Sequence, residues 1–287
     1  MMIRFSVKSD IKQIVNLWNE AFGDSEDEIM FFINNRYLPN NTLVCEIDGE
    51  IASLLFLLEG NMCIKNKDYP SYYLYAACTA KKYRGRGIMA SMLRFAQKTA
   101  QNRGYSFICL MPGENSLFDF YEKHGYKTVF KKKLITVNRT SLSDHPASFN
   151  FSSDNSSINL SEIRNEALYG IDYFKWDDKA IEFAFNHNKM YGGEILNSCE
   201  GYLLYTQNNG ILVVNETTFT SSRLKECLIF LAQKYNNEEI IVNVPVSCEC
   251  EIGSAKIVPA AMMLALNDET EKMINQIDGA YLGLTLD

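Results

Sequence analysis

The first 138 residues alternate between helical and strand-like spacing of apolar side chains. Apolar residues at 11, 14, 15, 17, 18 and 22 predict a helix that Gly23 would end, and a second helix is expected over residues 25–36. Strands are predicted at 42–47, at 51–59 after an Asp48-Gly49 turn, and at 72–79. A helix at 87–102, a strand at 106–111, a short helix through Tyr121 and a strand at 126–137 follow. This alternation predicts an α/β (α+β) fold.

The rest of the chain partly repeats this order after a change in composition. Residues 139–159 are rich in Ser, Asn and Asp and predict a surface linker. Helices are expected at 160–169 and 176–187, and strands at 193–196, 201–205 and 211–215, with an Asn209-Gly210 hairpin turn. A helix at 221–235, a strand at 239–244 and further strands to residue 287 complete the order. We therefore expect two related tandem halves, 1–138 and 160–287.

Composition and charge narrow the class of protein. Hydrophobic residues make up 47% of the 287 residues and charged residues 22%, which is typical of a soluble globular protein. The longest apolar run, residues 51–58, is strand-sized, and the first residues lack a signal-peptide pattern, so a cytoplasmic location is expected. The net charge of −7 and the lack of a long basic cluster argue against nucleic acid and are compatible with a cationic partner.

The eight cysteines do not suggest disulfides or a metal site. Most lie in apolar runs, where a reduced cysteine behaves as a small hydrophobic residue. Cys248-x-Cys250 resembles half of a metal site, but no second Cys or His pair stands at ligand spacing. We expect no bound metal and no membrane contact, and formation of a homo-oligomer stays open.

The most informative segment follows the strand 72–79. It reads Arg84-Gly85-Arg86-Gly87-Ile88-Met89, and a helix begins within it. A strand, a glycine-rich turn and a helix N-terminus form an anion cradle, because backbone N–H groups point outward and the helix dipole favours negative charge. The expected guest is a phosphate or pyrophosphate, and a flexible basic turn is the alternative. The P-loop and dinucleotide-binding motifs do not occur in this segment.

This segment resembles the pyrophosphate motif of the Gcn5-related N-acetyltransferase (GNAT) superfamily, which has Arg or Gln, two residues, Gly, one residue and a small residue. The family's next signature is an apolar strand, a polar turn, and a Tyr followed by a Gly-aromatic pair. Here it corresponds to residues 107–111, a turn, Tyr121 and Gly125-Tyr126. The resemblance covers residues 3–138. It implies a mixed, mostly antiparallel sheet flanked by helices, with acetyl-CoA as the co-substrate.

The resemblance also implies roles for individual residues. Tyr121 would protonate the departing CoA thiolate. Backbone groups of the strand end would pair with the pantetheine arm, and amides of the loop and the helix start would hold the pyrophosphate. Glu114, with Asn115 beside it, takes the place of an Asn of the family's turn. The implied cofactor-binding residues are Ala77, Cys78, Thr79, Arg84, Gly85, Arg86, Gly87, Ile88, Met89, Ala90, Glu114 and Asn115.

Two departures from the family pattern affect these roles. Met89 stands where the family prefers Gly or Ala, and the strand 72–79 lacks the Glu that many members use as general base. The missing Glu and a second half without its own glycine-rich loop resemble the enhanced-intracellular-survival type, a group of aminoglycoside acetyltransferases. In that type a C-terminal carboxylate acts as base, which here implies Asp287, although we expect this chain to be without that type's additional C-terminal domain. An ordinary closing strand at residues 281–287 is the alternative.

The second half is expected to be structural. Glu216 follows a strand where a pyrophosphate loop would begin, but the following TTFTSS has no glycine and no basic pair, so we expect no CoA binding there. Glu216, Asp172 and Asp177 are either negative charges for a cationic acceptor or solvated carboxylates. The nearby aromatic residues are either core or a substrate platform: Tyr169, Tyr173, Phe174 and Trp176.

The sequence thus predicts an acetyl-CoA-dependent N-acetyltransferase that acts on a primary amine of a small molecule or peptide. A non-catalytic acyl-CoA-binding module is the main alternative, because the strand Glu is missing. An aminoacyl transferase that uses charged tRNA on the same fold is a third, and the acidic net charge and the intact loop count against it.

Overall fold

The computed structural model describes residues 1–142, 159–208, 210–235 and 237–284. Most of the predicted linker, Asn209 of the predicted hairpin turn and Asp287 lie outside the described residues. The chain divides into two compact units, and strands β3, β4, β6 and β12 run from one into the other. Unit 1 comprises Met1–Met62, Tyr69–Thr128 and Ala261–Gln276, and unit 2 comprises Cys63–Asp68, Val129–Ala260 and Ile277–Asp287.

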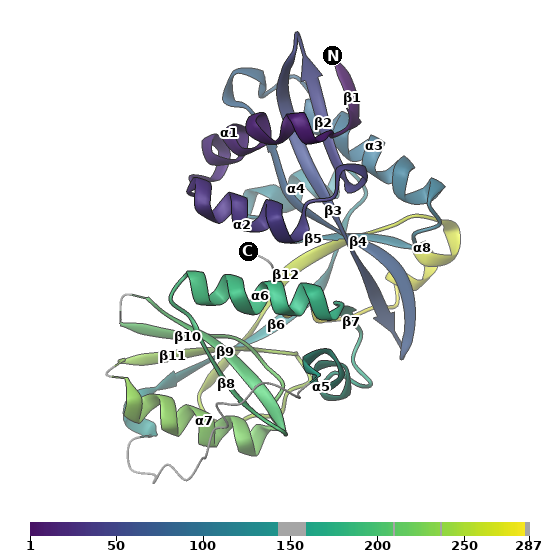
Figure 1. Ribbon diagram of the computed structural model, residues 1–287. Coiled ribbons are helices and arrows are strands. Elements are labelled where there is room, and N and C mark those ends of the chain that lie inside the picture. Colours follow the sequence, from purple (N-terminus) through teal and green to yellow (C-terminus); the bar gives the residue numbers. More distant parts are fainter. Residues whose placement is uncertain (143–158, 209, 236, 285–287) are drawn as a thin grey trace. The chain divides into compact units, whose positions relative to one another are not determined.

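Unit 1 follows the predicted alternation closely, and Figure 1 labels its elements. Its helices are α1 (Ile11–Phe22), α2 (Glu26–Arg36), α3 (Ile88–Asn102), α4 (Ser116–Glu122) and α8 (Asp268–Ile274). Its strands are β1 (Met2–Phe5), β2 (Thr42–Ile47), most of β3 (Glu50–Ile64) and β4 (Lys67–Thr79), β5 (Phe107–Leu110) and the end of β12 (Ser254–Ala265). Strand β1 and helix α8 were not predicted, and α8 replaces part of the strands expected near residue 287.

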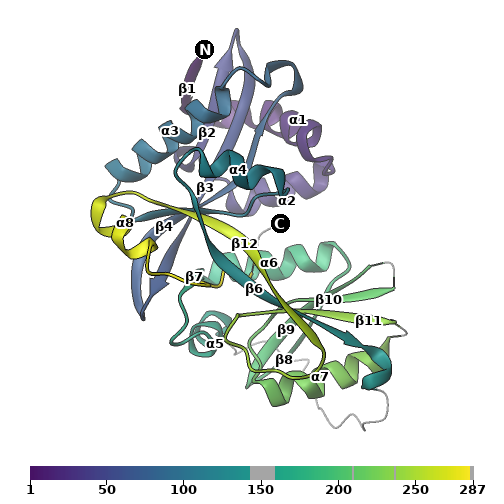
Figure 2. The ribbon, with the colours of Figure 1, turned by 180° about the vertical axis from the view of Figure 1, so that it is seen from behind.

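The sheet of unit 1 has the order β1-β2-β3-β4-β5-β12. Strand β4 pairs with β5 in parallel, whereas β1 with β2, β2 with β3 and β5 with β12 are antiparallel. Helices α1 and α2 cover one face of this sheet, and α3 and α4 cover the other (Figures 1 and 2). Successive residues of β3 point to opposite faces of the sheet. Leu55 and Leu57 join the core under α3, whereas Phe56 packs on Trp18 of α1.

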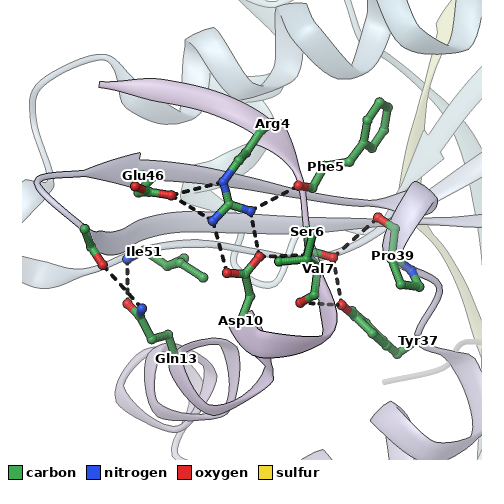
Figure 3. Close-up of polar contacts among 11 residues, drawn as sticks. Arg4, Phe5, Ser6, Val7, Asp10, Gln13, Tyr37, Pro39, Glu46 and Ile51 are labelled. Carbon is green, nitrogen blue, oxygen red and sulfur yellow. Dashed lines mark hydrogen bonds and ion pairs between the residues drawn. The ribbon is translucent and has the colours of Figure 1, made fainter.

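A polar network attaches β1 to its neighbours in unit 1 (Figure 3). The Arg4 guanidinium donates to Asp10 at 2.7 and 3.0 Å and to Glu46 of β2 at 2.8 and 3.0 Å. Asp10 also accepts from the backbone N–H of Val7 at 2.8 Å. The hydrogen bonds from Arg4 hold the pKa of the Asp10 carboxyl below its usual value. The network fixes the start of α1, whose far end reaches the candidate site.

Unit 2 contains helices α5 (Leu160–Ala167), α6 (Asp178–Met190) and α7 (Ser221–Lys234). Its strands are β6 (Lys127–Asn138), β7 (Tyr173–Lys175), β8 (Glu194–Ser198), β9 (Gly201–Asn208), β10 (Ile211–Thr217), β11 (Glu239–Val244) and the start of β12. The order β6-β11-β10-β9-β8 is antiparallel except for the parallel pair β10–β11, which α7 connects. Apolar residues of α7, including Leu224 and Leu228, pack with Leu203 and Leu212 of the sheet.

The α/β (α+β) class with a mixed, mostly antiparallel sheet is confirmed. Each unit contains a parallel strand pair joined by one helix, β4-α3-β5 in unit 1 and β10-α7-β11 in unit 2. This repetition supports the tandem relation, while the boundaries 1–138, 139–159 and 160–287 stay a prediction. No helix among the described residues is long and apolar enough to cross a membrane.

Candidate active site

The glycine-rich loop connects β4 to α3 through a short 3-10 turn, Lys81–Tyr83. Gly85 and Gly87 have φ angles of +74° and +71°, and Gly87 is the N-cap of α3. Apart from each glycine and its two chain neighbours, no atom of the described residues lies within 4 Å of a Cβ built on either glycine, so the backbone conformation, and not crowding, favours glycine here. The first amides of α3 have no partner within the helix and are available to an anion.

The backbone of strand β4 is irregular before it reaches this loop. Ala76, near the end of β4, has a φ of +47°, a conformation that costs about 1–3 kcal/mol in a residue with a Cβ. The parallel ladder to β5 includes only Ser71, Tyr72 and Tyr73 on the β4 side. Residues 77–79 therefore extend beyond the part of β4 that pairs with β5. A strand edge of this kind suits an extended amide-containing ligand.

A cavity of about 730 Å³ lies in unit 1 where β4 ends, and Tyr121 forms part of its wall. Of the predicted residues it brings together Ala77, Cys78, Thr79, Arg84, Gly85, Gly87, Ile88, Met89, Ala90, Glu114 and Tyr121. Residues that the sequence did not suggest also line it: Ala21, Phe22, Tyr83, Gly113, Leu117 and Phe120. The first two come from the end of α1, far from the motif in sequence.

Two of the predicted residues that the structure describes, Arg86 and Asn115, do not line this cavity. The Arg86 guanidinium lies over the Tyr83 ring, 5.5 Å from its centroid, and donates to the backbone carbonyl of Lys82 at 3.2 Å. Asn115 is the N-cap of α4 and makes no side-chain capping bond. Asp287 lies outside the described residues. Arg84, by contrast, lines the cavity and braces the loop, because its Nε donates to the Thr79 carbonyl at 2.9 Å.

Tyr121 is held by rings on two sides. The Phe120 and Tyr126 rings stand edge-on to it, with centroids 5.2 and 5.6 Å away. Its side chain is buried, and desolvation raises its pKa to about 12. The phenol therefore stays protonated near neutral pH and is able to donate a proton.

Cys78 is a second polar side chain at the cavity, but it is not a reactive thiol. Burial raises the pKa of the Cys78 thiol to about 12, so almost no thiolate exists at neutral pH. Its carbonyl accepts from the Ser53 hydroxyl at 2.7 Å, which fixes the strand end. No group of three or more His, Cys, Asp or Glu in the described part of the chain is arranged to hold a metal ion.

The carboxylates considered in the second half have structural partners. Glu216 is not a solvated carboxylate, because it is 1% exposed and paired with Arg164 at 3.0 Å in unit 2. Asp177 caps α6, and Asp172 accepts from the backbone N–H of Lys65. Of the four aromatic residues, Tyr173, Phe174 and Trp176 are buried in the core and only Tyr169 is exposed.

Comparisons with known proteins concern the family and the fold of the chain. Residues 2–129 match the family model described as acetyltransferase (GNAT) domain. A search of curated protein sequences found no significant match. A GCN5-related N-acetyltransferase from Anabaena variabilis has a similar fold, with a TM-score of 0.77 at 14% identity over 93% of this chain and 73% of that one.

Two further solved structures are similar over nearly the whole chain. Eis1 from Mycobacterium abscessus has a TM-score of 0.68 at 12% identity, covering 93% of this chain and 74% of that one. A putative acetyltransferase from Pyrococcus horikoshii has a TM-score of 0.61 at 18% identity, covering 99% and 94%. At these identities the similarity establishes the fold of the chain.

Proposed function

Since residues 2–129 belong to the GNAT family of acetyltransferases, we propose that this chain transfers an acetyl group from acetyl-CoA directly to a primary amine. The observation that carries the proposal is the single cavity shared by the loop before α3, the free end of β4 and Tyr121. Its volume of about 730 Å³ suits the acyl end of CoA together with a small acceptor. The donor amides of α3 and Arg84 suit the pyrophosphate.

In the proposed reaction the neutral amine attacks the thioester carbonyl, a C–N bond forms and the C–S bond breaks. Tyr121 supplies the proton that the departing sulfur needs, and it recovers one from solvent afterwards. The amine loses its own proton to solvent or to a base. Cys78 has too high a pKa to serve as an acetyl carrier, which favours direct transfer over an acetyl-enzyme. Asp287 as that base stays a prediction.

The test is thiol release from acetyl-CoA with a panel of amines, comparing the native chain with Tyr121→Phe. We expect kcat to fall by about a hundredfold or more, while acetyl-CoA affinity, measured by calorimetry, stays the same. Tyr126→Phe is a matched control, because Tyr126 is also buried and its hydroxyl has no hydrogen-bond partner among the described residues. Tight acetyl-CoA binding without turnover of any amine would favour the non-catalytic acyl-CoA-binding module.

A further inference from the structure

The cavity has an apolar rim that does not belong to the phosphate-binding loop. Phe22 at the end of α1 is 51% exposed and Leu117 of α4 is 36% exposed, and both line the cavity. Phe120 of α4 lines it as well. Large apolar side chains that are exposed at the same cavity mark contact with a ligand. The phosphate end of CoA does not bind apolar side chains, because phosphates are bound by backbone amides and cations.

The charges around the cavity are also unevenly distributed. Among the described residues that line it, Glu114 is the one carboxylate and Arg84 the one guanidinium. Glu114 accepts from the Ser116 hydroxyl at 3.2 Å and has no cationic partner within the described part of the chain. Glu20 of α1 does not line the cavity, and its carboxylate accepts from the backbone N–H of Lys81 at 2.8 Å. Glu114 therefore keeps a negative charge available to a ligand.

The chemistry of the two substrates decides which one Glu114 faces. CoA carries negative phosphates, and its pantetheine arm is neutral, so a carboxylate gains little from it. An acceptor amine is an ammonium before it loses its proton, and a carboxylate within about 4 Å attracts it by about 1–4 kcal/mol, depending on solvent exposure. A second charge farther along the acceptor would have to lose water against Phe22 and Leu117, which is unfavourable.

We infer that the acceptor is a primary amine on an apolar or aromatic body, with Phe22 and Leu117 contacting the body and Glu114 holding the ammonium. The inference rests on the proposed function and specifies the substrate class of the same site. It assigns Glu114 to binding of the acceptor. The family resemblance implies a different role for Glu114, binding of the cofactor. Polyamines and aminoglycosides, which carry several charges, are disfavoured.

The test compares two amines that differ only at the far end, n-hexylamine and 1,6-diaminohexane, at saturating acetyl-CoA and one pH. We expect kcat/KM to favour n-hexylamine by at least about tenfold, the range that one apolar pocket contact provides. Phe22→Ser is expected to raise the KM for n-hexylamine about tenfold, and Glu114→Gln to raise the KM for both amines, with the KM for acetyl-CoA unchanged. Leu38→Ser is the matched control, because Leu38 is 54% exposed and does not line the cavity.

A binding titration separates this inference from the proposed function. Both amines are titrated into the CoA-saturated protein, where no transfer takes place. Preferential binding of n-hexylamine that Phe22→Ser abolishes, without turnover of any amine of the panel when acetyl-CoA is supplied, would support this class of bound amine and refute the transferase. Turnover with equal or better use of 1,6-diaminohexane, or an unchanged KM in Phe22→Ser, would overturn the acceptor class and leave the transferase in place.

Discussion

Replacing Glu216 by Gln should destabilise the protein strongly, because the carboxylate is the centre of a buried network in unit 2. Its oxygens accept from Arg164 Nε at 3.0 Å, Arg164 Nη2 at 3.2 Å, the Tyr202 hydroxyl at 2.5 Å and the Leu284 backbone N–H at 2.6 Å. Arg164 is 0% exposed. A glutamine amide removes the charge and places N–H groups against donors, so the guanidinium is left buried without a counter-charge.

Breaking a buried ion pair by neutralising one partner costs about 3–5 kcal/mol. At roughly 2–4 °C per kcal/mol, the melting temperature should fall by about 10 °C. Urea denaturation followed by circular dichroism measures the change in the free energy of unfolding. The control is Glu200→Gln, which removes an exposed partner of Arg223 on the same unit and should have little effect. Equal effects of the two substitutions on the free energy of unfolding would refute the reasoning. The double variant Arg164→Met with Glu216→Met should recover part of the lost stability, because it leaves no unpaired charge.

Two further predictions concern unit 1. Gly87→Ala should weaken acetyl-CoA binding about tenfold in calorimetry, because an alanine at a φ of +71° costs about 1–2 kcal/mol and shifts the start of α3. The control is Gly104→Ala, which has a φ of +76° beyond the other end of α3 and should leave the affinity unchanged. Equal losses of affinity in the two variants would contradict the anion cradle. Asp10→Asn should cost about 1–3 kcal/mol at pH 7. Because the folded pKa of Asp10 is lowered, this contribution is present above the unfolded value of about 3.9 and is lost as the pH falls through the folded value, so the difference from the native chain should vanish in acid unfolding curves below that range.

The sequence predicts the short buried strands well and the long hairpins less well. Strands β2 and β11 were predicted with the bounds observed, because turn residues flank each apolar run. Strand β3 continues to Ile64, past the predicted end at residue 59. The hairpin turn lies at Lys65 and Asn66, which have φ angles of +50° and +62°. Strand β4 then begins at Lys67, before the predicted start at residue 72.

The end of the described chain shows what local patterns do not determine. Strand β12 pairs with β5, with Met262 opposite Leu110, and nothing in either segment specifies a partner about 150 residues away. Helix α8 was missed in favour of strands, although Asn267 and Thr270 form a capping box at its start. The tail has isolated bridges at Ala280 and Tyr281 and no regular strand over the described residues to 284.

The residues of the candidate site also fall into those that local patterns predict and those that only the fold brings together. The loop and the start of α3 were predicted from glycines and a helix dipole that act locally, and Tyr121 was predicted from the family resemblance; all of them line the cavity. Phe22 was not found, because only the folding of α1 against the sheet brings it to the cavity. Ala76 was not found either, because a positive φ at an alanine is imposed by the surrounding sheet and has no signature in the residue type.

This division has a physical basis in the two substrates. A donor with a fixed pyrophosphate and a fixed amide arm is held by backbone groups, so a short motif is enough to specify its site. An acceptor is selected by side chains, and those that we propose for this role line the cavity from separate elements: Phe22 of α1, Leu117 of α4 and Glu114 of the turn before α4. Each of these could change without disturbing the loop or Tyr121. The donor is therefore predictable from the chain's resemblance to its family, whereas the acceptor has to be inferred from the side chains that the fold places around one cavity.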